Sequence, residues 1–186
     1  SKTFIKLINN YKNSKNIDLK CLSVHIGSQI LDHKPYENML KSISKILEKI
    51  KYRFEFIDLG GGMGISYESK QKSLDYKKYH FVIKKFLKNH KSKIIFEPGR
   101  SIIGNTGTLI SKIVCIKKSG KKNFIILDAA MNDLMRPALY GAIHRIMPSL
   151  KINKISYENH EFVGPICEST DSFLNLKKFQ ELKENE

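Results

Sequence analysis

The chain has 186 residues, enough for an ordinary domain with a hydrophobic core, and 41% of them are hydrophobic, a fraction typical of globular proteins. No apolar run approaches the roughly 18 to 20 residues of a transmembrane helix, and the first residues lack the apolar segment of a signal peptide, so neither a membrane span nor a secretory route is predicted. Three scattered cysteines match neither a disulfide framework nor a metal-binding spacing, which favours a reducing, cytoplasmic setting without a bound metal.

The formal net charge is +15, a value that raises the question of nucleic-acid binding. The lysines are spread over the whole chain and fall on the polar faces of predicted helices, while the densest cluster, "KKSGKK" at 117–122, has the composition of a hairpin turn. We therefore attribute the charge to a general lysine bias and predict no nucleic-acid partner. Arginine, in contrast, is confined to Arg53, Arg100, Arg136 and Arg145.

Helical periodicity predicts three helices in the first half of the chain. Apolar residues recur every three or four positions within residues 2–15, 32–50 and 76–87. The second of these stretches has a possible cap at Asp32 and carries Pro35 in its first turn, where proline is favoured.

Short apolar runs between these stretches predict buried strands at 19–27, 54–59 and 93–96. Strands that alternate with helices form a parallel sheet. The runs lead into "HIGSQ", "GGGMG" and "EPGR", and the carboxyl ends of parallel strands are where α/β folds place their sites. Two cysteines inside apolar runs, Cys21 and Cys115, are expected in the core.

The pattern changes near residue 105. Segments 107–118 and 123–131 are apolar or alternating and are joined by "SGKK", which predicts a β-hairpin, and the segments 157–166 and 171–176 continue the strand-like pattern. We therefore predict an α/β part at residues 1–105 and a mainly β part at residues 106–186.

The glycine cluster "GGGMG" at 60–64 is compatible with phosphate binding but does not fit the dinucleotide pattern G-x-G-x-x-G. A glycine-rich strand end can hold one phosphate through backbone N–H groups, and "EPGR" on the next strand could add more. Three glycines taken alone are more simply explained by a tight turn.

Several side chains near the predicted strand ends and turns are candidates with ordinary alternatives. Taken alone, His25 is more simply a core histidine, and Glu97 a carboxylate with a local partner. Arg136, which opens a short helix together with Tyr140, can hold a carboxylate by two parallel hydrogen bonds. The lone thiol of Cys167 beside Glu168 in "GPICES" is structural about as often as functional.

Five segments together resemble, in order and spacing, the motifs of the diaminopimelate decarboxylase family: "VHIGSQ", "IDLGGGMGISY", "EPGRSII", "LDAAMNDLMRPALYGAIH" and "VGPICEST". The resemblance runs from about residue 20 to 176. It implies a fold-type III pyridoxal 5'-phosphate enzyme, in which the C-terminal part of an alanine-racemase-like (β/α)8 TIM barrel is followed by the start of a β-sandwich or barrel-like domain. Two positions depart from the family's usual pattern, Ala130 and Thr170, and neither removes a functional group.

The resemblance implies a cofactor site at the strand ends. His25 would lie against the pyridoxal ring, and Glu97 would bond the pyridine nitrogen and keep it protonated. The phosphate would be held by Ser28, by Gly60, Gly61 and Gly62, and by the backbone at Gly99 and Arg100, with Pro98 in the same cofactor site. A protonated pyridinium drains charge from the carbanion that decarboxylation leaves. Alanine racemases of the same fold place an arginine there, so Glu97 favours a decarboxylase.

The resemblance also implies a substrate site, in which Arg100, Arg136 and Tyr140 grip the distal carboxylate. Cys167 would donate a proton and Glu168 would bind the distal amine, with both residues reaching the site of the partner subunit in a homodimer. The reaction would be the decarboxylation of meso-diaminopimelate to L-lysine. The alternatives are a decarboxylase of ornithine, arginine or carboxynorspermidine on the same fold, and a non-catalytic relative that binds partners and has lost the cofactor.

A complete barrel takes about 250 residues, so this chain is expected to be an internal fragment with the last three barrel strands. The Schiff-base lysine that the family requires would lie upstream of residue 1, and a tyrosine near the cofactor downstream of residue 186. We therefore expect the isolated chain to be inactive and poorly folded, with an open sheet edge.

Overall fold

The computed structural model describes residues 2–67, 71–150 and 153–185 and divides the chain into two compact units. The first unit contains Ser1–Ser66 and Gln71–Gly107, and the second contains Tyr67–Lys70 and Thr108–Glu186. The boundary between the two units falls between Gly107 and Thr108, whereas the sequence pattern predicted it between residues 105 and 106. The identification of the two parts with portions of a barrel and of a β domain stays a prediction.

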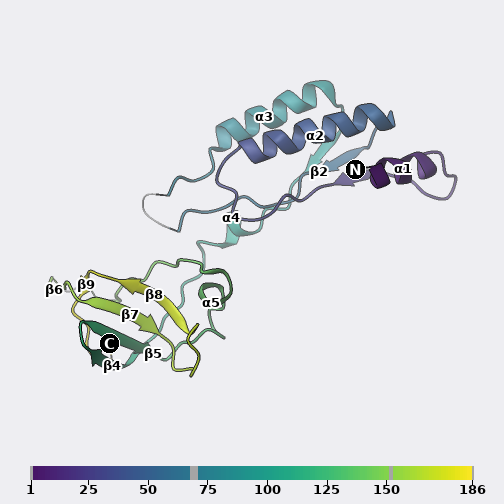
Figure 1. Cartoon of the computed structure of the whole chain (residues 1–186). Helices are drawn as coiled ribbons and strands as arrows, with labels where there is room; N and C mark the ends of the chain where they lie inside the picture. The colour runs from purple at the N-terminus through teal and green to yellow at the C-terminus, as the bar shows by residue number, and fades with distance from the viewer. Residues whose placement is uncertain (1, 68–70, 151–152, 186) are drawn as a thin grey trace. The chain divides into compact units, whose positions relative to one another are not determined.

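The first unit alternates helices and strands (Figure 1). In chain order its elements are α1 (Lys2–Tyr11), β1 (Cys21–Ser23), α2 (Lys34–Ile50), β2 (Phe56–Asp58), α3 (Tyr76–Asn89), β3 (Lys93–Ile95) and α4 (Arg100–Ile103). The strands form one sheet in the order β1-β2-β3, and both pairings are parallel. The predicted parallel sheet is therefore confirmed, although each strand has only three residues.

The core of the first unit lies between the sheet and the helices α2 and α3, which pack side by side (Figure 1). Helix α2 buries the stripe that its periodicity predicted: Tyr36, Met39, Leu40, Ile43, Leu47 and Ile50. From α3, the residues Tyr79, Ile83 and Phe86 complete this layer, and Ile57 at the centre of β2 is fully buried beneath it. Burial of these faces, rather than helix propensity, stabilises both helices.

Carboxylates mark the beginnings of both helices. The side chain of Asp75 accepts hydrogen bonds from the N–H groups of Lys77 and Lys78, at 3.0 and 3.1 Å, and these bonds lower the pKa of Asp75. At α2 the N-cap residue is His33, but the Oδ1 atom of Asp32 accepts from the N–H of Lys34 at 3.1 Å, which lowers the pKa of Asp32. Asp32 thus performs the predicted capping role, although it lies one residue before the N-cap residue His33.

The expected burial of Cys21 and Cys115 is wrong. Cys115 is half-buried, in a strand whose pairing register shifts between Ile113 and Cys115. Cys21 is exposed, because side chains of a strand alternate between its two faces. Strand β1 consequently buries Leu22 alone, with Cys21 and Ser23 on the opposite face. The apolar run at 19–27 is therefore not the fully buried strand that its composition predicted.

The second unit is built around a four-stranded sheet (Figure 1). Its elements are β4 (Ile113–Ser119), β5 (Lys122–Leu127), α5 (Arg136–Tyr140), β6 (Ile155–Ser156), β7 (Asn159–Val163), β8 (Ser172–Leu176) and β9 (Phe179–Gln180). The sheet order is β4-β5-β7-β8, in which only β5 and β7 run parallel, and β6 pairs with β9. The predicted hairpin is confirmed as β4–β5, turning at Gly120 with a φ of 57°.

A small core of Ile113, Ile125 and Phe162 holds the second unit together. Phe162 packs edge-on against Phe179, with ring centroids 5.2 Å apart. Within the described parts of the chain, none of the helices combines the length and the apolar character needed to traverse a bilayer.

Candidate functional site

The carboxyl ends of β1, β2 and β3 stay paired beyond the strands. The N–H of Val24 donates to the carbonyl of Asp58 at 2.9 Å, and the N–H of Glu97 donates to the carbonyl of Gly60 at 2.9 Å. The parallel sheet therefore brings the segments "HIGSQ", "GGGMG" and "EPGR" side by side, as the sequence pattern predicted.

The neighbouring chain segments leave no room for a side chain at the three glycines of this turn. A Cβ atom on Gly61 would lie 2.2 Å from the carbonyl oxygen of Glu97, and one on Gly60 would lie 2.8 Å from the Nδ1 atom of His25. Gly62 has a φ of +88°, and a Cβ there would lie 2.3 Å from the carbonyl oxygen of Gly27. The turn is thus packed between the two flanking strand ends, which a tight turn alone would not require.

The buried side chains of Asp58 and Tyr36 hold this glycine turn by hydrogen bonds. The sequence did not reveal this role for either residue. The buried carboxylate of Asp58 accepts from the N–H of Gly60 at 2.8 Å and from the hydroxyl of Ser23 at 3.0 Å. The fully buried hydroxyl of Tyr36 donates to the carbonyl of Gly61 at 3.2 Å. Burial raises the pKa of Tyr36 to about 12.

Replacing Tyr36 by phenylalanine is expected to lower the free energy of unfolding by about 1 kcal/mol, because the Gly61 carbonyl loses its buried donor while the packing is kept. The raised pKa means that the folded state favours the neutral phenol. The contribution of the neutral Tyr36 phenol to the free energy of unfolding is fully present below the ordinary pKa of 10 and is lost as the pH rises toward 12. The free energy of unfolding, measured by urea denaturation at pH values from 7 to 11, should therefore fall less steeply with pH for Tyr36→Phe than for the wild type. Tyr11→Phe, at a partly exposed position, is the control.

His25 and Glu97 both present exposed side chains at the strand ends. The interpretation of His25 as a core histidine is therefore wrong. Its Nδ1 atom accepts from the N–H of Gly61 at 3.4 Å. Among the residues that the structure describes, no hydrogen bond or ion pair holds the carboxylate of Glu97, which leaves it accessible to a ligand. Ser28 is exposed on the same segment as His25.

Arg100 begins α4, immediately after Pro98 and Gly99. Its Nη1 atom donates to the Oε1 atom of Gln29 at 2.9 Å, while the amide nitrogen of Gln29 donates to the carbonyl of Ile65 at 2.6 Å. Gln29 therefore orients the guanidinium by one of its donors and leaves the others available. No atom lies within 4 Å of the position of a Cβ on Gly99, so the backbone there is open.

In the second unit, Arg136 is the first residue of α5 and is held by two side chains that the sequence reasoning did not single out. Its Nη1 atom donates to the hydroxyl of Tyr67 at 2.9 Å and lies 3.2 Å from the Nε2 atom of His144. The guanidinium carbon lies 5.2 Å from the centre of the Tyr67 ring. Tyr140, one helical turn further along α5, is 74% exposed. The signal for Tyr67 and His144 was their place inside "GISY" and "ALYGAIH".

Cys167 and Glu168 lie exposed in the loop between β7 and β8. The loop is short and closed on itself, since the N–H of Asp171 donates to the carbonyl of Glu168 at 3.0 Å and the N–H of Glu168 to that of Ile166 at 2.8 Å. Both side chains are thus presented by a well-bonded turn.

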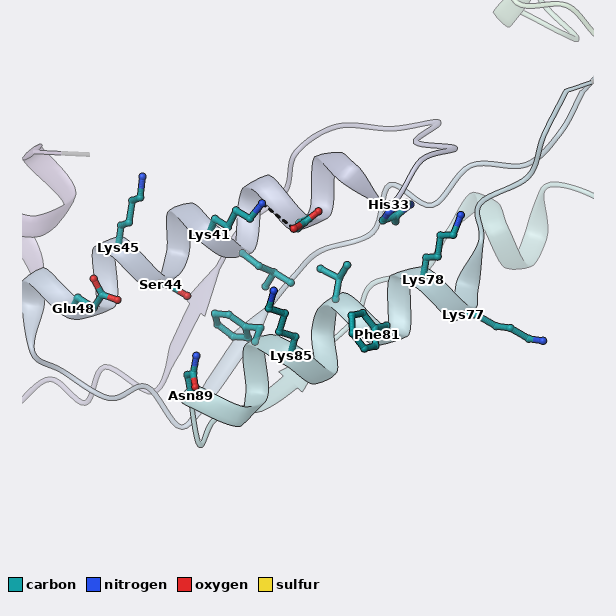
Figure 2. Close-up of a pocket in the computed structure, with 14 residues that line it drawn as sticks. His33, Lys41, Ser44, Lys45, Glu48, Lys77, Lys78, Phe81, Lys85 and Asn89 are labelled. Carbon is teal, nitrogen blue, oxygen red and sulfur yellow. Dashed lines mark ion pairs between the residues drawn. The ribbon is translucent and has the colours of Figure 1, made fainter.

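A groove of about 780 Å³ lies between α2 and α3 (Figure 2). Its walls carry lysines such as Lys41 and Lys85 and the exposed ring of Phe81, and none of the candidate site residues lines it. Across the ranges that the structure describes, no group of three His, Cys, Asp or Glu side chains could hold a metal ion.

The sequence model of the family described as "Pyridoxal-dependent decarboxylase, C-terminal sheet domain" matches residues 13–186. The diaminopimelate decarboxylase of Aquifex aeolicus is 38% identical over 175 residues, which are 92% of this chain and 41% of the relative. That of Zymomonas mobilis is 40% identical over 172 residues, covering 90% of this chain and 40% of the relative.

Solved structures give the same result. The crystal structure of diaminopimelate decarboxylase from Helicobacter pylori complexed with L-lysine superimposes with a TM-score of 0.89 at 35% identity. The match covers 99% of this chain and 46% of that structure, so the chain spans less than half the length of each of these three relatives. Because the family model covers nearly the whole sequence, the chain belongs to the pyridoxal-dependent decarboxylase family.

Proposed function

We propose that the protein containing this chain decarboxylates meso-diaminopimelate to L-lysine and carbon dioxide, with pyridoxal 5'-phosphate as its cofactor. The observation that carries the proposal is the convergence of His25, the glycine turn and Glu97 at three adjoining strand ends. The relatives named diaminopimelate decarboxylase support it, as does the L-lysine in the H. pylori structure, because lysine would be the product.

The corresponding architecture is the C-terminal part of a (β/α)8 barrel followed by the start of a β domain. Three parallel strands linked by helices, with site residues at their carboxyl ends, support the barrel part. The mainly antiparallel sheet of the second unit supports the β part. A homodimer with shared active sites and a cytoplasmic location belong to the same proposal.

The residues at the strand ends fit pyridoxal phosphate. The exposed carboxylate of Glu97 suits a protonated ring nitrogen, and the imidazole of His25 is exposed beside the glycine turn. Because Asp58 and His25 already accept from the N–H groups of Gly60 and Gly61, the phosphate would rest on Ser28, on Gly62 and on the backbone N–H groups of Gly99 and Arg100, which follow Pro98. When bound, the cofactor would withdraw electrons from the bond between the α-carbon and its carboxylate.

The remaining residues would bind and protonate the substrate. Arg136 offers the planar donor fork that grips a carboxylate, held ready by Tyr67 and His144, and Arg100 and Tyr140 would assist it. Glu168 would bind the distal ammonium group. The exposed thiol of Cys167 would deliver the proton that replaces the lost carboxylate.

The second candidate function is decarboxylation of another basic amino acid, such as ornithine, arginine or carboxynorspermidine. A lysine/ornithine decarboxylase from Vibrio vulnificus shares the fold, with a TM-score of 0.82 at 19% identity. Arg136 favours diaminopimelate, because a substrate that ends in an amine alone has no distal carboxylate to bind.

A full-length protein that contains this chain, loaded with pyridoxal phosphate, tests the proposal directly. Carbon dioxide and L-lysine should form from meso-diaminopimelate, with a kcat/KM at least about 100-fold above that for ornithine or arginine. A substrate without a distal carboxylate would leave the guanidinium of Arg136 unpaired, which costs several kcal/mol. Equal turnover of ornithine would transfer the assignment to the second candidate. Failure to bind the cofactor, together with no turnover of any of these amino acids, would support the non-catalytic relative.

Arg136→Lys should raise the KM for diaminopimelate roughly tenfold or more while leaving the absorbance of the bound cofactor unchanged, because lysine keeps the charge but loses the bidentate geometry. Steady-state kinetics and an absorbance titration with the cofactor measure the two effects. Arg53→Lys is the matched control, since Arg53 donates to the carbonyl of Lys91 outside the candidate site. An unchanged KM in Arg136→Lys would remove Arg136 from the substrate site.

A further inference from the structure

Asp171 is a buried carboxylate for which the proposed reaction has no role. Only 3% of the residue is exposed. Its two oxygens accept from two different backbone segments: Oδ1 from the N–H of Met131 at 2.7 Å, and Oδ2 from the N–H of Ile166 at 2.8 Å. Burial of a carboxylate is costly unless its charge is compensated by hydrogen bonds, so these two donors are what make the position tolerable.

The two donors belong to the two loops that carry the candidate substrate-binding residues of this unit. Ile166 directly precedes Cys167 and Glu168, whereas Met131 begins the turn that leads to Arg136. The main chain of Asp171 also closes the first loop, since its carbonyl accepts from the N–H of Gly164 at 3.0 Å. One residue therefore bonds both loops at once.

Gly164 makes room for this arrangement. A Cβ on Gly164 would lie 2.2 Å from Oδ2 and 2.5 Å from Oδ1 of Asp171, so any larger residue there would displace the carboxylate. The loop is thus built around the side chain of Asp171.

We propose that Asp171 is a positioning residue, which fixes the loop of Cys167 and Glu168 against the segment of Arg136 so that the proton donor and the substrate-binding groups keep one relative geometry. The proposal rests on the proposed function for its consequence in catalysis. To hold both segments, Asp171 needs both of its carboxylate oxygens as hydrogen-bond acceptors. Asparagine retains one carbonyl oxygen and turns an NH₂ group toward the second N–H, so Asp171→Asn keeps one bond and loses the other. Alanine loses both.

Hydrogen exchange tests the bonding without reference to activity. In a full-length protein that contains this chain, the amides in peptides covering residues 129–135 and 164–170 should exchange roughly tenfold faster in Asp171→Asn and faster still in Asp171→Ala. The matched control is Asn123→Ala, which removes a buried polar side chain of β5 that bonds Glu158, away from both loops. Wild-type exchange in both peptides of Asp171→Asn would overturn the proposal.

Kinetics test the consequence for the reaction. Asp171→Asn should lower kcat for diaminopimelate roughly tenfold to a hundredfold, because misplaced groups lose their orientation, and should also raise KM. A loss of folded enzyme lowers the apparent kcat but does not change KM, so the KM value separates positioning from mere stability. Asn123→Ala should leave KM unchanged. If Asp171→Ala does not fold, the isosteric Asp171→Asn variant decides the outcome.

The failures of the two proposals are distinguishable. If the wild-type protein does not decarboxylate diaminopimelate, the proposed function fails, while faster exchange in both peptides would still support the bonding role of Asp171. If the wild type is active and Asp171→Asn has wild-type kcat and KM, the positioning role is wrong whatever the exchange shows.

Discussion

Gly61→Ala is expected to lower the free energy of unfolding by about 3 kcal/mol and to abolish binding of the cofactor. The added Cβ would stand 2.2 Å from the carbonyl oxygen of Glu97, well inside contact distance. The atom in the way is backbone rather than the end of a flexible side chain, so the strand ends must separate, which places the cost at the upper end for overpacking. The separation would move Glu97 itself, and the cofactor would lose its ring partner together with the turn.

Urea denaturation and an absorbance titration with pyridoxal phosphate measure both effects in a full-length protein. Gly107→Ala is the matched control, because no atom lies within 4 Å of the position of its Cβ and its φ is not in the left-handed region. If Gly61→Ala binds the cofactor with wild-type affinity, the glycine turn is not part of the site.

The sequence predicted the fold well where burial follows a period. Helix α2 buries nearly every apolar residue of its 3.6-residue stripe, and the alternation of strands and helices led directly to the parallel sheet. Prediction failed where a strand is too short for its pattern to be read. With three residues in β1, the apolar run of 19–27 could not reveal that Cys21 faces away from the core and Leu22 toward it.

The candidate site divides in the same way. Most of the residues that the resemblance singled out lie at strand ends and in a loop, and Arg100, Arg136 and Tyr140 lie on the short helices α4 and α5. The residues that hold them were missed, because their contacts join distant segments: Tyr36 bonds Gly61, Gln29 bonds Arg100, and Asp171 bonds Met131. Periodicity records which residues are buried, but it does not record which backbone group a buried hydroxyl or carboxylate will meet.

Asp58 and Asp171 illustrate this limit. Both are almost fully buried, at 8% and 3% exposure, although aspartate is among the residue types that are rarely buried. Each is tolerated because backbone N–H groups of a neighbouring turn satisfy it. Asp171 meets the N–H of Met131 only after the chain has folded, and the burial of Asp58 depends on its place in the sheet, so in the sequence both look like exposed aspartates.

Mixing two inactive variants of the full-length protein is expected to restore about a quarter of the wild-type activity, if Cys167 serves the site of a partner subunit. One variant carries Glu97→Ala, in the unit of the cofactor residues, and the other carries Cys167→Ala, in the second unit. After dissociation and random reassociation, half of the dimers are mixed. In each of these one site combines both defects, and the other site has neither.

The control mixes Glu97→Ala with His25→Ala. Both changes lie in the same unit, so each site of a mixed dimer retains one defect and no activity should return. Activity is measured as lysine formed per dimer, with mixed dimers counted by native mass spectrometry. If Glu97→Ala and Cys167→Ala form mixed dimers without activity, Cys167 acts within its own subunit or is not the proton donor. A quarter of the activity, against none in the control, would require that each site take its thiol from the neighbouring chain.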